Sequence, residues 1–473
     1  MNLVLFAPEL VLIIAVLVLF VISLGTGRDR LAATSTIIAG LAALAACAAT
    51  FSLQGDLFYH AYRIDLFSQI FKFFILAGLT GITLFGQRLK DIRNDIRPEY
   101  FLFLLLATLG LVMLVSCVEL ISLLVSLELS SFAIYLLIPL RCERGGLRMQ
   151  MESAAKYVIF GVLATGIMLF GMSYLFGLTG STYFADIAPI LLERWAEPLA
   201  VAAIVLTLLG LLFKLAAFPM HLWAPDVYQG ASNETTAYIT GVPKAAAVAV
   251  IIRFLLMADS TAHELVIFLT FIAVVSMFFG NIVAIVQKDL KRMFGYSAIA
   301  HAGYITVGFV TLQGSGFSAA TFYAFAYLVM SLPVFLVICQ VSAQGENLVI
   351  DDFAGLHERS PAAALIMGLS LFALAGIPPF AGFFAKLLLM TAALDRGLVL
   401  LVVMMAINSA IGVYYYLNVV RVMYFEKAAE REPVPFRTLP LSLGIILLLA
   451  ISALGIAPRY LMDAIATAIQ GLL

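Results

Sequence analysis

Apolar stretches of about twenty residues or more alternate with short polar segments along the whole chain. A helix rises about 1.5 Å per residue, so such a stretch crosses the ~30 Å hydrocarbon core of a bilayer. The pattern predicts about fourteen membrane-spanning helices. Their expected ranges are 3–24, 31–51, 64–86, 99–116, 119–140, 151–178, 199–221, 235–258, 264–286, 291–312, 317–343, 361–392, 398–424 and 438–457, followed by a short amphipathic tail at 458–473.

Composition agrees with this pattern. The 473-residue chain is 63% hydrophobic and 12% charged, with a mean hydropathy of +1.08. The alternating ten-residue segments of a membrane barrel are absent, so we predict an all-α polytopic membrane protein. A net charge of −1 gives no electrostatic reason to expect a nucleic-acid partner. The cysteines form no CxxC pair and no metal or iron–sulfur signature; they are Cys47, Cys117, Cys142 and Cys339.

The loops between the expected spans differ in charge. Basic residues gather in the odd-numbered loops, for example in the third loop, whereas the even loops and the C-terminus carry few. Loops rich in Lys and Arg stay on the cytoplasmic side. We therefore expect both termini on the outer side, and the first apolar stretch to be a retained span rather than a signal peptide.

Two of the expected spans are interrupted beside a lysine. The first is FKLAAFPMHLW at 213–223, with Lys214, Pro219 and His221, and the second is LAGIPPFAGFFAK at 374–386, ending at Lys386. Proline breaks a helix and frees a backbone carbonyl that a neighbouring group must satisfy. The two breaks lie five spans apart, an odd offset. This spacing predicts two inverted five-helix repeats, each with a broken helix.

Charged residues inside spans cost at least ~2.5–3.5 kcal/mol at the bilayer centre, so their positions point to function. A lysine whose carboxylate partner can approach or retreat acts as a switchable proton site. Glu128 is the expected partner of Lys214. Lys244, His301 and Lys386 would extend a chain of exchangeable sites through the membrane centre.

Other polar residues allow a purely structural explanation. Lys156 follows Glu152 by four residues, as in an ordinary helix ion pair, although a functional role is also possible. His221 and His301 fit either a proton path or a satisfied core. We expect Lys72 to pair locally or to extend toward the interface. Arg253, near a helix end, is also expected to reach the interface.

Several motifs resemble one known family. HLWAPDVYQGA at 221–231, YSAIAHAGY at 296–304 and LAGIPPFAGFFAK at 374–386 resemble the antiporter-like subunits of respiratory complex I, the proton-translocating NADH:quinone oxidoreductase. The DVYQG variant is similar to the branch called subunit N. SLELSSF around Glu128 and ESAAKYVIFG around Lys156 fit the same branch.

The resemblance implies fourteen helices and a domain order of 1–98 (three helices), 99–258 and 259–426 (two repeats), and 427–473 (C-terminal helix and tail). It implies proton translocation coupled to electron transfer in partner subunits, without redox chemistry in this chain. NADH, FMN, iron–sulfur clusters and quinone are expected only in those partners, and this chain is expected to hold no cofactor or metal. Other membrane-arm subunits and lipids are the expected contacts, in a bacterial inner membrane. The implied proton-path residues are Glu128, Lys156, Lys214, His221, Lys244, His301 and Lys386.

Three other functions stay open. A subunit of a cation/proton antiporter or of a membrane-bound hydrogenase complex would share the fold. A scaffold subunit would hold its neighbours without carrying protons. An isolated symporter would need a substrate cavity, which no motif in the sequence indicates.

Overall fold

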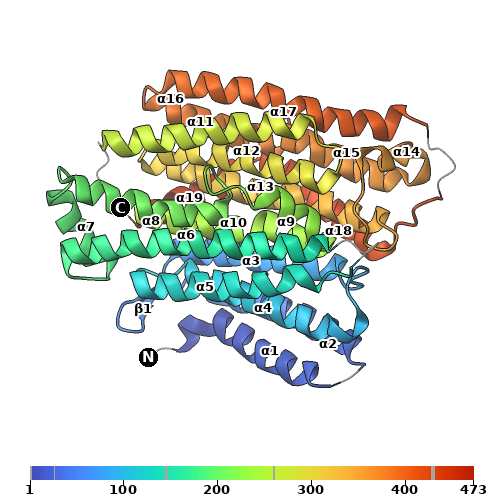
Figure 1. Cartoon of the computed structure of the whole chain (residues 1–473), viewed down its shortest axis with the longest axis horizontal. Coiled ribbons are helices and arrows are strands. Elements are labelled where there is room, and N and C mark those ends of the chain that lie inside the picture. The colour runs from blue at the N-terminus through green and yellow to red at the C-terminus, as the bar shows by residue number, and fades with distance from the viewer. Residues whose placement is uncertain (1–2, 26, 144–147, 259–261, 428–431, 473) are drawn as a thin grey trace.

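The computed structural model describes residues 3–25, 27–143, 148–258, 262–427 and 432–472. Its long helices run side by side, horizontally in Figure 1, and the two ends of the chain lie at the same end of the bundle. The first elements are η1 (Leu3–Phe6), α1 (Ala7–Ser23), α2 (Asp29–Ala49), β1 (Gly55–Leu57), β2 (Tyr62–Ile64), α3 (Leu66–Phe85), η2 (Asn94–Ile96), α4 (Arg97–Leu114), α5 (Leu120–Leu137), η3 (Ile138–Leu140) and α6 (Met149–Thr179).

The remaining elements complete the bundle. They are α7 (Phe184–Glu193), α8 (Pro198–Leu215), α9 (Ala224–Gly230), α10 (Asn233–Leu255), α11 (His263–Ile285), α12 (Leu290–Val310), α13 (Gly314–Val341), η4 (Ile350–Phe353), α14 (Leu356–Arg359), α15 (Pro361–Ala375), α16 (Ala381–Asp395), α17 (Val399–Phe425), α18 (Thr438–Ile456) and α19 (Arg459–Gln470).

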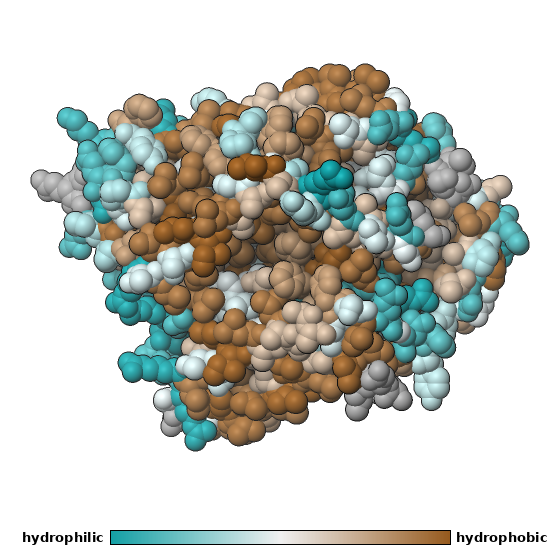
Figure 2. Space-filling view, turned by 180° about the vertical axis from the view of Figure 1, so that it is seen from behind, coloured by the Kyte–Doolittle hydropathy of each residue, from teal (hydrophilic) through white to brown (hydrophobic). Residues whose placement is uncertain are grey.

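The helices have the length and composition needed to cross a membrane. Among the described residues, 13 helices are long and apolar enough to do so. The remaining expected span, 361–392, corresponds to α15 and α16, which the break at residues 376–380 divides into two helices of 15 residues each. Figure 2 shows the matching surface, with apolar residues across the middle and polar residues at the two ends where the helices end. The predicted fold class is confirmed.

Side chains at the helix starts explain several boundaries. Asp65 accepts a hydrogen bond from the Ser68 amide (2.7 Å) at the start of α3, and Glu119 accepts one from the Ser122 amide (2.6 Å) at the start of α5. Such side chains satisfy amide groups that have no partner within the helix. Glu119 therefore has a capping role, and the long apolar run at 99–140 divides at residues 115–119, close to the predicted position.

The two broken helices confirm the predicted interruptions. α8 ends at Leu215, and α9 resumes at Ala224; α15 and α16 repeat the arrangement around Gly376. Each break contains a residue of positive φ followed by a cis proline, Pro219 in one and Pro379 in the other. The second broken span comes five spans after the first, so corresponding helices of the two units run in opposite directions. The predicted domain boundaries are not tested by these observations, and the one at 258/259 adjoins residues 259–261, which lie outside the described part.

The centre of the bundle is formed by α10, α12 and α13. All of the spanning window of α10 is buried, and 94% of that of α12 and of α13, against 33% for α17 and 22% for α18. α10 packs against α13, α3 and α8. Pro243 lies inside this helix without ending it. The candidate residues Lys244 and His301 are thus placed on the most enclosed helices.

Four elements were not predicted from the sequence or were predicted only in outline: β1, β2, α7 and α19. β1 and β2 form an antiparallel hairpin, and α7 is a short helix between α6 and α8. Both are too short to produce a strong periodic signal. The expected tail is the helix α19, which buries Ile465 and Ile469 and packs against α13 and α3.

Candidate functional site

The first break places Lys214 at the end of α8. The side chain of Lys214 is buried, and its Nζ lies 3.5 Å from Ser130 Oγ on α5. Ala216 has a positive φ of 62° and ends the helix. The freed carbonyl of Phe213 accepts a hydrogen bond from Trp223 Nε1 (3.1 Å). A neighbouring side chain thus satisfies a backbone group of the break, as a membrane interior requires.

Glu128, on α5, is near Lys214 but does not touch it. Its Oε1 accepts a hydrogen bond from Thr165 Oγ1 (2.5 Å) on α6. The carboxylate interacts electrostatically with Lys214, yet no ion pair joins the two in the described structure. The two side chains of the expected pair therefore contact different hydroxyl groups, Glu128 that of Thr165 and Lys214 that of Ser130.

Lys244 on α10 is the next buried amine. Its Nζ donates to the Ala298 carbonyl of α12 (3.1 Å) and lies 5.5 Å from the ring centroid of Tyr327. The side chain is 2% exposed. A carbonyl and an aromatic face accept an ammonium group without fixing its charge as a carboxylate would.

His301 lies between Lys244 and Lys386 and interacts electrostatically with both. Its Nδ1 is 2.8 Å from Tyr323 OH, and its Nε2 is 3.0 Å from Tyr416 OH. Tyr416 OH is in turn 2.5 Å from Ser297 Oγ. These hydroxyl groups can both donate and accept, so a proton can pass along them.

Lys386 on α16 lies directly beside the second break. Its Nζ donates to the Ala375 carbonyl (2.8 Å) and to Ser409 Oγ (2.9 Å), and it lies 5.1 Å from the ring centroid of Tyr304. Gly376 has φ +88°, and a Cβ there would be 3.1 Å from Lys386 Nζ. Glycine is needed both for the backbone conformation and for the approach of the amine.

Five predicted residues thus form the candidate series: Lys214, Lys244, His301 and Lys386, which are buried, and Glu128, which is half-buried near Lys214. Electrostatic interactions join Glu128 to Lys214, and His301 to both Lys244 and Lys386. Sequence reasoning missed the side chains that connect the second half of this series. Asn281 donates to Tyr304 OH (3.0 Å), and Tyr415 OH donates to Asn281 Oδ1 (3.1 Å). Tyr415 and Tyr416 lie in the apolar motif IGVYYYLN, whose run of tyrosines was the available signal.

Lys156 and His221 lie apart from this series. Lys156 pairs with Glu152 (2.7 Å), as predicted, and with Asp226 (2.7 Å), which also binds Arg292 (2.5 Å). The Lys156 side chain is 38% exposed, unlike the buried lysines. His221 packs between the rings of Phe218 and Phe279, with centroid distances of 5.5 and 4.7 Å.

Two basic residues outside the series have partners that the sequence did not reveal. Lys72 on α3 forms an ion pair with Glu9 on α1 (2.7 Å), with both side chains fully buried, and Tyr62 OH donates to Glu9 (2.6 Å). Arg253, expected at the interface, is buried instead and pairs with Asp65 (2.8 Å). A carboxylate at the start of another helix retains this arginine inside the protein.

Comparisons with known proteins agree with this geometry. The family model described as NADH:quinone oxidoreductase/Mrp antiporter, TM, matches residues 117–412. The chain is 47% identical over 466 residues to NADH-quinone oxidoreductase subunit N 2 of Opitutus terrae, covering 97% of this chain and 96% of that one. It is 40% identical over 475 residues to subunit N 2 of Syntrophobacter fumaroxidans, covering 100% of both.

Solved structures show the same architecture. A chain of respiratory complex I from Thermus thermophilus with bound Aureothin matches with a TM-score of 0.85 and 28% identity, covering 98% of this chain and 100% of that one. A chain of the Mrp complex from Dietzia sp. matches with a TM-score of 0.88 over 100% of this chain and 98% of its own, at 20% identity, which shows a shared fold alone.

The fold and the matches define an antiporter-like membrane subunit. The chain belongs to the NADH:quinone oxidoreductase/Mrp antiporter family, and the curated relatives described above are its subunit N members. The resemblance predicted from the motifs is confirmed. The roles of individual residues stay predictions, because these comparisons do not test them.

Proposed function

We propose that this chain is the proton-translocating subunit N of the membrane arm of an NADH:quinone oxidoreductase. One observation carries the proposal. Lys214, Lys244 and Lys386 are buried at the breaks and in the centre of the bundle, and in the described structure none forms an ion pair with a carboxylate. Their partners are hydroxyl and carbonyl groups, which leave the ammonium proton exchangeable.

The proton path follows these contacts. Glu128 modulates the charge of Lys214 from a distance, and a shift of the carboxylate toward the amine would stabilise the ammonium form. In this path a proton moves from Lys244 to His301, whose ring nitrogens contact Tyr323 and Tyr416, and then on to Lys386. Lys244 and His301 sit on α10 and α12, whose spanning windows are 100% and 94% buried, which limits leakage to lipid.

Electron transfer in partner subunits supplies the free energy. NADH, FMN, iron–sulfur clusters and quinone bind in those partners, and this chain carries no redox chemistry of its own. Moving one charge across 100 mV requires about 2.3 kcal/mol, a scale that changes in a buried charge pair can match. We place the chain in a bacterial inner membrane, beside other membrane-arm subunits, with both termini on the periplasmic side.

A related cation/proton antiporter subunit is the second candidate. The likeness of fold to the Mrp complex and to the membrane-bound sulfane sulfur reductase (TM-score 0.87) favours it. The two functions differ in partners, so purification with NADH-oxidising subunits, rather than with antiporter subunits alone, separates them.

The test is proton pumping by inverted membrane vesicles that contain the Lys214→Ala variant. We expect the complex to assemble, and NADH-driven pumping and coupled electron transfer to fall at least about tenfold, because a carrier is missing. Lys427→Ala, at an exposed loop lysine, is the matched control and should pump normally. Normal pumping by an assembled Lys214→Ala complex would contradict the proposal.

A scaffold role is distinguished by a second variant. Lys214→Arg retains the positive charge, but a guanidinium group does not release its proton in proteins. If Lys214 only holds neighbouring helices together, Lys214→Arg will assemble and pump normally. The proposed function requires it to assemble and to pump poorly.

A further inference from the structure

A cavity of about 530 Å³ opens at the end of the bundle opposite the β1–β2 hairpin. It lies between the end of α3, the end of α13 and the segment that leads into α18. The proton path described above does not reach it. Its walls carry four basic side chains and two acidic ones: Arg88, Lys90, Arg359, Arg437, Glu234 and Glu432.

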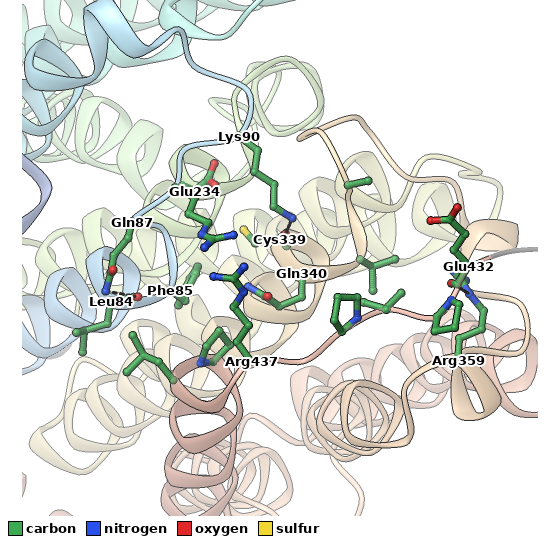
Figure 3. A pocket seen from close by; sticks show the side chains of 18 residues that line it. Leu84, Phe85, Gln87, Lys90, Glu234, Cys339, Gln340, Arg359, Glu432 and Arg437 are labelled. Atoms are coloured by element: carbon green, nitrogen blue, oxygen red, sulfur yellow. Dashed lines mark hydrogen bonds between the residues drawn. The ribbon is translucent and has the colours of Figure 1, made fainter. Parts of the chain in front are cut away.

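Two of the basic side chains are bound to backbone carbonyls. Lys90 Nζ donates to Cys339 (2.8 Å) and Ser342 (2.7 Å) at the end of α13, where the helix dipole favours a cation. Arg359 donates to the carbonyls of Glu432 (3.2 Å) and Asp352 (3.0 Å). Figure 3 shows Arg359 beside Glu432 at one end of the cavity. These cations mainly hold the walls together.

Arg88 and Arg437 differ from these two. Both are exposed, they come from separate elements, and neither forms an ion pair or side-chain hydrogen bond with any described residue. In Figure 3 the side chain of Arg437 extends from the start of α18 into the cavity, and its guanidinium lies beside Gln340. Two unpartnered guanidinium groups on the wall of one cavity can supply paired N–H donors, which a phosphate group accepts.

The acidic side chains leave this part of the cavity positive. Glu432 lies at the far end beside Arg359. Glu234 is 6% exposed, packs beneath Gly86, and interacts electrostatically with Lys90 and Lys291 from the protein side. Both carboxylates therefore have cations nearby other than Arg88 and Arg437.

The cavity also has apolar walls that continue onto a lipid-facing helix. Leu84, Phe85 and Leu439 line it. Leu439 (42% exposed), Ile446 (59%) and Leu449 (65%) lie along α18, the least buried of the spans. A ligand bound here can place a phosphate at the arginines and hydrocarbon along α18.

We propose that this cavity binds the headgroup of an anionic phospholipid, with Arg88 and Arg437 as the phosphate ligands. Free phosphate shares the anionic chemistry but would leave the apolar walls unused. Basic pockets between membrane helices on the cytoplasmic side are suited to such headgroups, and the positive charge of the loops places this end there.

The test compares three forms of the assembled complex, purified in detergent and depleted of lipid. They are the unaltered complex, the Arg88→Gln/Arg437→Gln variant and the control Arg28→Gln/Arg30→Gln, which removes two exposed arginines of another loop. Fluorescent phosphatidylglycerol and phosphatidylcholine are titrated into each form, and inorganic phosphate is added as a competitor.

We expect the Arg88→Gln/Arg437→Gln variant to bind phosphatidylglycerol about thirtyfold more weakly, as two surface cations would predict, and the control to be unchanged. Phosphatidylcholine should bind weakly to all three.

Equal phosphatidylglycerol binding by all forms would overturn the proposal, whether the cavity is empty or covered by a partner's acidic segment. Displacement of the lipid by millimolar phosphate, with no preference for the lipid, would also overturn it. If the glutamine variant fails to assemble, the Arg88→Lys/Arg437→Lys variant is tested instead. Weaker phosphatidylglycerol binding than by the unaltered complex supports the proposal, and unchanged affinity contradicts it.

Discussion

Two acid–lysine pairs in this protein show how the same residue types serve different purposes. In the N-terminal module, which comprises α1 to α3, Glu9 and Lys72 are fully buried and their charged groups lie 2.7 Å apart. In the first repeat, Glu128 and the buried Lys214 interact electrostatically without an ion pair, and they contact the hydroxyl groups of Thr165 and Ser130, respectively. Direct contact fixes the charges of the first pair, whereas separation leaves the second able to change.

Aromatic packing also separates the two regions. Phe74 of α3 stacks on Phe325 of α13 with ring centroids 3.9 Å apart, and Phe71 contacts the same ring (4.8 Å). These rings lie between the N-terminal module and the centre of the bundle. The Glu9–Lys72 ion pair joins α1 to α3. Mutations in the two regions are therefore expected to have different effects.

The largest effect is expected for Lys72→Met. Removing one partner of a buried pair leaves an uncompensated charge and costs about 3–5 kcal/mol, so the variant should assemble poorly. Glu9→Gln/Lys72→Met, which removes both charges, should recover most of the assembly. The thermal midpoint and the yield of intact complex measure both effects. A stable Lys72→Met complex that fails to pump would instead place Lys72 in the proton path.

A smaller effect, on pumping rather than assembly, is expected for Tyr416→Phe. This change removes the hydroxyl that contacts both His301 and Ser297. Loss of a buried hydrogen-bond partner costs about 1–3 kcal/mol, so pumping should fall about tenfold while the complex remains intact. Vesicle pumping is measured beside Tyr460→Phe, a change at a tyrosine that is 84% exposed. If both variants pump alike, the tyrosine link between His301 and Ser297 is not needed.

The smallest effect is expected for Thr165→Val. Without the hydroxyl donor, Glu128 is free to approach Lys214, and the open pair becomes more like the closed pair of the N-terminal module. Pumping should fall about threefold, in line with a net hydrogen-bond contribution of about 0.5–1.5 kcal/mol. Thr391→Val, at an exposed threonine, is the control. An increase in pumping would show that Thr165 restrains the carrier instead of keeping it open.

The sequence predicted the features that depend on local composition. Span positions follow from hydrophobic length, and both breaks follow from Pro219 and from Gly376 with its prolines, because these residues interrupt helices wherever they occur. The buried lysines were identified because a charge in an apolar run is conspicuous.

Features that depend on contacts between distant segments were not predictable in this way. Glu9 meets Lys72, and Asp65 meets Arg253, across separate helices, and no spacing rule links them. The tyrosines near His301 were missed for a related reason. Tyrosine is common in apolar helices, so Tyr416 gave no signal of its own. Only the packing of α12 against α17 brings its hydroxyl group to Ser297.

The complete enclosure of α10 has a consequence for how the protein is made. The chain emerges from the ribosome N-terminus first, so α3, α4 and α8 are present when α10 enters the membrane, whereas α13 is not. Lys244 of α10 will contact Tyr327 of α13. Until α13 is inserted, this face of α10 lies beside lipid or within the insertion machinery. Biogenesis of this subunit thus includes an interval in which Lys244, a residue of the proposed proton path, lacks its final surroundings, and insertion factors that shield α10 would protect it during that interval.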